Sequence, residues 1–209
     1  MPYRAPVRDL RFILDHVVGF SDLAATARFA DATPDMVDAI LTEAGRVATD
    51  LLAPLNRSGD LTPARLENGA VVASPGFAAG YSALAKGGWV GMTAHPDHGG
   101  MGLPVALATA VDDMMSGACL ALHLKPVLSK GQIEALEHHA SDAIKALYLP
   151  RLCSGEWSGT MNLTEPQAGS DVGALRTKAE PNGDGTHAVT GQKIYISWGD
   201  SDLVSNVCH

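Results

Sequence analysis

The sequence predicts an α+β protein, with an all-α helical domain over residues 1–157 and the beginning of an antiparallel β domain over residues 158–209. Two observations lead to this prediction. From Val7 to about Ser154, apolar residues return every three or four positions, which is the period of an amphipathic helix. After Gly155 the chain changes to short runs of β-branched or alternating residues, which are typical of strands separated by turns.

The clearest helix is expected to begin after Thr33. A threonine here can accept a hydrogen bond from an amide of the first turn, and Pro34 and Asp35 both suit that turn. Apolar residues follow at helical spacing as far as Leu52, and Pro54 is expected to end the helix. Because one side of this helix is apolar, we expect it to pack in a helical core. Further helices are expected over residues 76–86, 103–116, 130–138 and 141–153.

The remaining segments are expected to be loops and strands. The Gly- and Pro-rich segment 95–104 is expected to form a shaped loop. A strand is expected to end at Thr164, because Pro166 removes a backbone donor and fixes its own φ. The last expected strand still runs at His209, so we expect the protein to continue beyond this residue. The strands after Thr164 are expected over residues 177–179, 187–189, 193–197 and 203–208.

Composition and charge narrow the function classes. Of the 209 residues, 46% are hydrophobic and 18% are charged, so we expect a folded globular protein rather than a disordered one. The net charge is −8 and the Lys and Arg residues are scattered, so nucleic acid is not an expected partner. No segment approaches about 18 uninterrupted apolar residues, and the N-terminus lacks the pattern of a signal peptide. A cytoplasmic protein without a membrane span is therefore expected.

The cysteines and histidines predict neither a disulfide framework nor a metal site. The three cysteines are far apart in the sequence, so free thiols are expected. Four of the eight histidines fall into two close pairs, and each pair lacks further ligands at suitable spacing. The residues concerned are Cys119, Cys153 and Cys208, and the pairs His95 with His98 and His138 with His139.

The most informative segment is 161–171, which reads Met-Asn-Leu-Thr-Glu-Pro-Gln-Ala-Gly-Ser-Asp. Gly169 permits close approach of another group to the backbone, and the amide and hydroxyl of Ser170 can donate to an anionic oxygen. This loop could therefore hold a pyrophosphate. The residue types are equally consistent with a β-turn in which Ser170 and Asp171 satisfy local amides.

The same segment closely resembles the TEPxAGSD signature of the acyl-CoA dehydrogenase family. Three further segments resemble the family in the same order: His-Gly-Gly-Met-Gly-Leu-Pro at 98–104, Tyr-Leu-Pro-Arg-Leu-Cys-Ser-Gly-Glu at 148–156 and Gly-Gln-Lys-Ile-Tyr-Ile-Ser at 191–197. Tyr-Arg-Ala-Pro at 3–6 and Leu-Asn-Arg-Ser-Gly at 55–59 are similar to the subgroup that includes 3-methylthiopropanoyl-CoA dehydrogenases. The resemblance spans nearly the whole chain.

The resemblance implies FAD as cofactor and assigns three groups of residues to it. The first group would hold the pyrimidine edge of the flavin, with the Thr164 hydroxyl among its donors. The second would meet the FAD pyrophosphate, and its Ser170 would also bind the acyl-CoA substrate near the pantetheine. The third would pack on the flavin and offer the Ser197 hydroxyl toward N5. The groups are Met161, Asn162, Leu163 and Thr164; Gly169 and Ser170; and Tyr195, Ile196 and Ser197.

Two residues leave alternatives open. Tyr195 stands where the family usually has tryptophan, so it could instead be an ordinary sheet residue that packs on a neighbour. Glu165 could be proposed as a catalytic base, but its place beside Pro166 favours a role in structuring the loop.

The reaction implied by the resemblance is α,β-desaturation of an acyl-CoA thioester. In the family the base is a glutamate of a C-terminal helical bundle, which is absent from this chain, so no catalytic residue is expected within it. The electron acceptor would be an electron-transfer flavoprotein or a similar protein, and the full-length form would be a homo-oligomer. Two alternatives remain: a non-catalytic fragment that binds flavin or a partner, and an acyl-CoA oxidase-like flavoenzyme.

Overall fold

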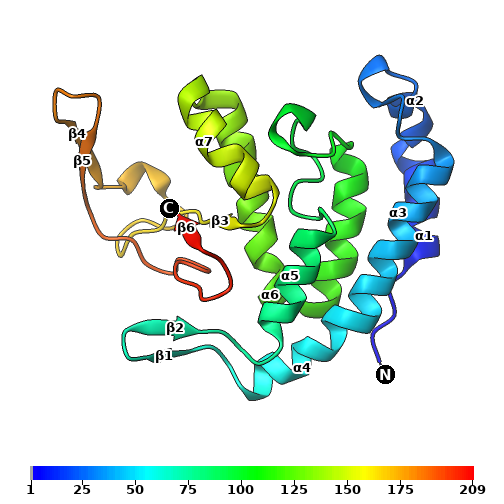
Figure 1. Cartoon of the computed structure of the whole chain (residues 1–209), viewed down its shortest axis with the longest axis horizontal. Coiled ribbons are helices and arrows are strands. Elements are labelled where there is room, and N and C mark those ends of the chain that lie inside the picture. The colour runs from blue at the N-terminus through cyan, green and yellow to red at the C-terminus, as the bar shows by residue number, and fades with distance from the viewer. Residues whose placement is uncertain (1) are drawn as a thin grey trace.

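The computed structural model describes residues 2–209. The helices stand side by side in one part of the molecule, and most of the strands lie on one flank of them together with the C-terminus (Figure 1). The α-helices are α1 (Val7–Ile13), α2 (Phe20–Ala24), α3 (Pro34–Arg46), α4 (Ala53–Leu61), α5 (Phe77–Lys86), α6 (Val105–His139) and α7 (Asp142–Cys153). The π-helical turns are η1 (Leu14–Val18) and η3 (Val47–Leu52), and the 3-10 turns are η2 (Ala27–Phe29), η4 (Pro96–His98) and η5 (Val172–Ala174). The strands are β1 (Arg65–Glu67), β2 (Ala70–Val72), β3 (Trp157–Gly159), β4 (Lys178–Pro181), β5 (His187–Thr190) and β6 (Asn206–Cys208).

The start of α3 confirms the expected cap, but its end differs from the prediction. The Thr33 hydroxyl accepts a hydrogen bond from the Met36 amide at 3.3 Å. Pro54 does not end the helix, because α3 continues through η3 into α4 and Pro54 lies in the first turn of α4. A π-helical turn is wider than an α-helical turn, which leaves room for a proline ring at the start of the next segment.

Helix α6 is a hairpin of two antiparallel limbs. Asp112 and Lys130 are 18 positions apart, which would separate them by about 27 Å in a straight helix, yet their side chains form an ion pair at 2.5 Å. The reversal occurs at Cys119, whose φ of −155° and ψ of 84° are not helical. The two helices expected here are therefore confirmed as separate limbs, each extending closer to the reversal than the sequence pattern indicated.

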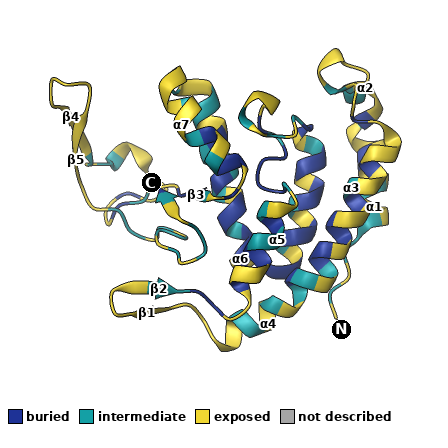
Figure 2. Ribbon diagram, in the orientation of Figure 1, coloured by how far each residue is buried: buried dark blue, intermediate teal, exposed yellow. Residues whose placement is uncertain are grey.

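The core lies between the two limbs of α6 and the helices beside them. Figure 2 shows buried residues along the facing sides of α3, α5 and α6. Leu41 and Leu52 from the predicted apolar stripe are completely buried with Val111 and Leu122 of α6 in one hydrophobic cluster. Burial of each such side chain contributes roughly 1.5–3 kcal/mol to folding.

The strands are only partly those expected. β4 and β5 pair antiparallel, as predicted. β3 and β6 pair parallel, with Trp157 opposite Asn206, so the prediction of a wholly antiparallel sheet is wrong at this pair. The intervening segment 160–205 crosses over and returns β6 in the same direction as β3, and a connection of this length permits parallel pairing.

Two expected strands are absent from the described residues. The ladder of β3 ends with a bond from the Thr160 amide to the Cys208 carbonyl, so no strand continues to Thr164. Segment 193–197 has no regular structure, because Tyr195 has a φ of 57° in the left-handed region, which interrupts an extended strand.

The hairpin of β1 and β2 was not expected from the sequence. Its turn consists of Asn68 and Gly69, both with positive φ, as a two-residue type I′ turn requires. An Asn-Gly pair is a strong hairpin signal, so this element could have been predicted. The domain boundary expected near residue 157 stays a prediction.

Within residues 2–209, α6 is the one helix whose length and composition would allow it to cross a membrane. Half of its most apolar stretch is buried in this fold, and the helix reverses direction at Cys119. Core helices of soluble proteins pass the same test of length and composition. The expectation of no membrane span stays a prediction.

Gly100 gives a direct test of the packing in the 95–104 loop. A Cβ built at Gly100 would lie 2.1 Å from the Ala94 carbonyl oxygen, whereas one at Gly131 in α6 would meet no atom within 4 Å. We expect Gly100→Ala to lower the free energy of unfolding by about 2–3 kcal/mol. The control Gly131→Ala should raise it by up to about 1 kcal/mol, because alanine favours the helix. Urea denaturation of both variants measures the difference, and equal stabilities would contradict the loop packing.

Candidate functional site

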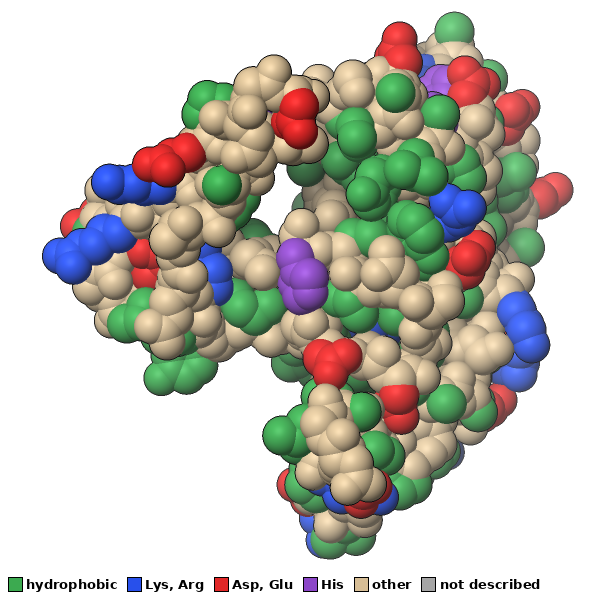
Figure 3. Space-filling model, turned by 60° about the vertical axis from the view of Figure 1, so that its left-hand side comes forward, with side chains coloured by type: hydrophobic (Ala, Val, Ile, Leu, Met, Phe, Trp, Pro, Cys, Tyr) green, Lys and Arg blue, Asp and Glu red, His purple; other side chains and the backbone are tan. Residues whose placement is uncertain are grey.

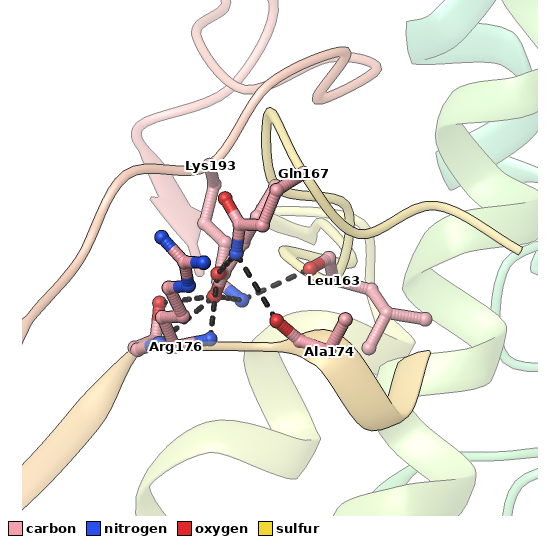
Figure 4. A network of polar contacts seen from close by, with 7 residues as sticks. Leu163, Gln167, Ala174, Arg176 and Lys193 are labelled. Atoms are coloured by element: carbon pink, nitrogen blue, oxygen red, sulfur yellow. Dashed lines mark hydrogen bonds and ion pairs between the residues drawn. The ribbon is translucent and has the colours of Figure 1, made fainter. Parts of the chain in front are cut away.

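The structure brings two of the three predicted flavin segments together. The Ile194 amide donates to the Thr164 carbonyl at 3.0 Å. The Lys193 ammonium donates to the Leu163 carbonyl at 2.9 Å, as Figure 4 shows. Segment 161–164 therefore lies beside the start of segment 193–197, although about thirty positions separate them in the sequence.

Glu165 holds this arrangement together, and its side chain is buried, with 3% of its surface exposed. Its carboxylate accepts hydrogen bonds from the amides of Arg176 and Thr177, at 2.7 and 3.0 Å. It also accepts from the Thr177 hydroxyl at 2.6 Å, the Gln167 side-chain amide at 2.6 Å and the Lys193 ammonium at 2.9 Å (Figure 4). Five donors thus converge on one carboxylate.

These contacts decide what Glu165 can do chemically. The hydrogen bonds from the Thr177 hydroxyl, the Lys193 ammonium and the Arg176 amide hold the pKa of Glu165 far below its usual range. A carboxylate with so low a pKa has little tendency to take a proton at neutral pH. Its contacts are those of a structural anchor for the loop, in agreement with the favoured sequence interpretation.

The loop between Glu165 and Ala168 is a tight turn, with reciprocal backbone bonds of 2.8 and 3.0 Å between these two residues. Asp171 accepts a hydrogen bond from the Gly173 amide at 3.1 Å, as the local-turn interpretation expects. Ser170 is exposed, and within residues 2–209 neither its amide nor its hydroxyl takes part in a hydrogen bond. The donors of Ser170 therefore remain available to a ligand.

Gly169 is not required by the packing of this chain. A Cβ at this position would meet no atom closer than the Thr164 side-chain methyl, at 4.0 Å. Apart from this methyl, the space beside Gly169 is open, as close approach of an external group requires.

Apolar side chains are exposed around the paired segments. Met161 is 64% exposed, Leu163 is 37% exposed and Tyr195 is 89% exposed. Figure 3 shows apolar side chains gathered on the body of the molecule, beside an opening between that body and a projecting arm. An exposed apolar patch next to free polar donors is typical of a ligand or interaction surface.

Segment 195–198 has an unusual backbone that is fixed by tertiary contacts. Tyr195 and Trp198 have φ values of 57° and 54°, in the region that L-residues rarely adopt. The Trp198 indole donates to the Ala121 carbonyl at the α6 reversal, at 3.0 Å. Tyr195 lies outside any strand and is almost fully exposed, so its interpretation as an ordinary packed sheet residue is wrong.

Not every predicted residue faces the paired segments. The Asn162 side chain accepts from the Thr160 hydroxyl at 2.6 Å and lies 3.4 Å from His209, so it faces the end of β6. Ile196 is half-buried and Ser197 is exposed. Lys193 was missed as a site residue, because its partner Glu165 is 28 positions away and ion pairing at that separation leaves no local pattern.

A separate cavity of about 600 Å³ opens between η2, the start of α3, the 93–104 loop and the end of α6. None of its lining residues belongs to the predicted flavin segments. The lining includes Arg28, His95, His98, Glu137 and His138. Among residues 2–209, no group of three or more His, Cys, Asp or Glu side chains is placed to hold a metal ion.

The family described as "Acyl-CoA dehydrogenase, N-terminal domain" matches residues 38–156, which is more than half of the chain. The chain belongs to the acyl-CoA dehydrogenase family. The match covers most of the helical part that packs around α6, and the predicted flavin segments lie after it in the chain.

Individual relatives agree with this assignment. The chain is 43% identical over its whole length to 3-methylmercaptopropionyl-CoA dehydrogenase of Ruegeria pomeroyi, of which it covers 36%. This likeness confirms the expected subgroup. The chain spans about a third of the length of this curated relative.

Solved structures show the same fold. Butyryl-CoA dehydrogenase from Megasphaera elsdenii matches with a TM-score of 0.65 and 22% identity, over 80% of this chain and 42% of that one. An acyl-CoA dehydrogenase from Bacillus anthracis, complexed with FAD, matches with a TM-score of 0.64 and 20% identity, over 79% of this chain and 27% of that one. These likenesses confirm an acyl-CoA dehydrogenase fold, with helices followed by strands.

The anchoring role of Glu165 predicts a defined pH dependence. A free glutamate titrates near pH 4.5, and the pKa of Glu165 is lower in the folded chain. The ionised carboxylate therefore stabilises the fold above pH 4.5, and this contribution is lost as the pH falls below 4.5 toward the folded pKa. We expect Glu165→Gln to be less stable than wild type at pH 7 and to show a weaker loss of stability below pH 4.5. Thermal melts from pH 7 to pH 3 measure this, with Glu180→Gln on exposed β4 as control.

Identical pH profiles for wild type and Glu165→Gln would contradict the anchoring role.

Proposed function

We propose that this chain forms one wall of the FAD and acyl-CoA site of an enzyme that desaturates an acyl-CoA thioester between its α and β carbons. The observation that carries the proposal is the pairing of segments 161–164 and 193–197 beside free donors and exposed apolar side chains. Membership of the acyl-CoA dehydrogenase family supports it. A relative with the same fold is complexed with FAD.

The residues of this chain fit a flavin in two ways. Met161, Leu163 and Tyr195 offer apolar surface that a planar ring system would cover. The hydroxyls of Thr164 and Ser197 are the donors proposed for the pyrimidine edge and for N5. FAD, when bound, would supply the acceptor for the hydride that leaves the β-carbon.

Ser170 and Gly169 are proposed to meet the FAD pyrophosphate. The amide and hydroxyl of Ser170 are free of other partners within residues 2–209, and Gly169 leaves room beside them. Oriented backbone donors of this kind bind anionic oxygens. The same Ser170 hydroxyl is proposed to contact the pantetheine part of the acyl-CoA.

The catalytic base is proposed to be a glutamate outside these 209 residues. Removal of an α-proton needs a carboxylate that can accept it and a polarised thioester carbonyl. Glu165 does not meet the first requirement, because five donors hold its carboxylate in the ionised form. The acyl group, the electron acceptor, proposed as an electron-transfer flavoprotein, and a cytoplasmic homo-oligomeric state are likewise proposals about the whole protein.

The intact mass and the flavin absorbance of the purified natural protein test this function. The proposal expects FAD bound in a one-to-one ratio and bleached anaerobically by an acyl-CoA. A mass of 209 residues with FAD bound but not bleached would favour the non-catalytic alternative, and rapid reoxidation of reduced flavin by oxygen would favour an oxidase. No flavin binding by the natural protein would overturn the proposal.

The Thr164 hydroxyl gives a specific test of flavin contact. We expect Thr164→Val to weaken FAD binding about 5- to 10-fold, because one hydrogen bond of about 1 kcal/mol is lost while the branched shape is kept. The matched control is Thr109→Val in α6, whose hydroxyl bonds only the Val105 carbonyl. Titration of the apoprotein with FAD measures both affinities, and equal affinities would contradict the role of Thr164.

A further inference from the structure

Lys125 is a completely buried lysine in the second limb of α6. Its ammonium donates to the Ser158 hydroxyl of β3 at 2.8 Å. It also lies over two aromatic rings, 5.4 Å from the centre of Tyr81 and 5.1 Å from the centre of Trp198. Three elements distant in sequence, α5, β3 and the segment before β6, therefore meet at one side chain.

The burial of this charge is not explained by an ion pair. Within residues 2–209 no carboxylate oxygen lies within 4.0 Å of the Lys125 ammonium. Burial lowers the pKa of Lys125 to about 8, although the charges of Asp202 and Asp200 act to raise it. A methionine would fill this space without the cost of burying a charge. Packing alone therefore does not require a lysine here.

The contacts of Lys125 lie at the flanks of both proposed flavin segments. Ser158 precedes segment 161–164 in the chain, and Trp198 directly follows Ser197. The ion pair of Glu165 and Lys193 joins the two segments to each other. From the helical hairpin, Lys125 contacts a residue close to each segment, Ser158 ahead of the first and Trp198 after the second.

The segment around Trp198 needs such support. The left-handed backbone at Tyr195 and Trp198 costs about 1–2 kcal/mol per residue, so it persists only where surrounding contacts fix it. The Trp198 indole bonds to the Ala121 carbonyl, and its ring lies 6.3 Å from that of Phe77. An ammonium under the indole face adds a cation–π contact to this set.

We propose that Lys125 is a positioning residue that clamps segments 161–164 and 193–197 against α6 in the geometry that receives the flavin. The expected effect on FAD binding rests on the proposed function, but the clamp itself concerns only residues of this chain. Loss of the ammonium would leave the helices intact and release both segments.

Hydrogen exchange without flavin tests the clamp directly. In Lys125→Met of the natural full-length protein, we expect the amide of Ile194 and peptides covering 161–165 and 193–198 to exchange about tenfold faster. Peptides of α3 and of the first limb of α6 should keep their protection. The matched control is Lys130→Met in the same limb, because Lys130 pairs with Asp112 and contacts neither segment.

A second variant separates the two arms of the clamp. Ser158→Ala removes the hydrogen bond at β3 and leaves Lys125 over Trp198. We expect faster exchange in peptide 157–165 and at the Ile194 amide, whose acceptor is the Thr164 carbonyl, and unchanged exchange at the amides of 196–198. Unchanged exchange of both peptides in Lys125→Met, or equal acceleration throughout the protein, would overturn the proposal.

FAD titration then tests the consequence. We expect Lys125→Met to weaken FAD binding about tenfold and to shift the visible flavin spectrum, while Lys130→Met has no effect on either. The affinity of wild type should fall as the pH rises past about 8, since the ammonium loses its proton there. The other titratable groups near it are Asp200, Asp202 and Tyr81, and burial raises the pKa of Tyr81 well above this range. Lys125→Met removes the pH dependence if Lys125 is its source.

The two proposals fail separately. If wild type binds no FAD but Lys125→Met still exchanges faster in the two segments, the flavin site is refuted and the clamp is kept. Wild type that binds FAD, with Lys125→Met equal to it in exchange and affinity, refutes the clamp and keeps the flavin site.

Discussion

The reversal of α6 at Cys119 is the constraint on which the rest of the structure depends. It places two apolar limbs antiparallel, so that their facing sides form the core with α3 and α5. The same reversal presents the Ala121 carbonyl to the Trp198 indole. A helix that ran straight through this point would carry the second limb away from the first, and the core that the two limbs share would be lost. The helical core and the proposed flavin site therefore share one element.

Much of the helical part could be predicted from the sequence, because its signals are local. The Thr33 cap and the apolar stripe to Leu52 are both read within a few residues, and both are found. The end of that helix was placed wrongly, because the π-helical turn ahead of Pro54 depends on packing that the local sequence does not specify. The parallel pairing of β3 with β6 joins segments almost fifty positions apart, and alternation of residue types does not distinguish parallel from antiparallel partners.

The segments that form the candidate site could be predicted from the sequence, but the side-chain contacts that hold them in place could not. Segments 161–164 and 193–197 were recognised from motifs, and the bond between Ile194 and Thr164 shows that they meet. The pair of Glu165 with Lys193 and the bond of Lys125 to Ser158 support them, and these two contacts span 28 and 33 positions. Such contacts follow from the tertiary fold, because neither residue type nor spacing marks them in advance. The left-handed φ of Tyr195 was likewise not predictable from the sequence, since tyrosine does not favour it.

The most direct measurement is the position of FAD on the natural protein, by amide chemical-shift mapping of the isotope-labelled apoprotein during titration. The account predicts that the largest shifts fall on the amides of Thr164, Ser170 and Ser197, with smaller shifts in the helices behind them. Shifts confined to the cavity lined by Arg28, His95 and His138, with none in segments 161–164 and 193–197, would contradict it.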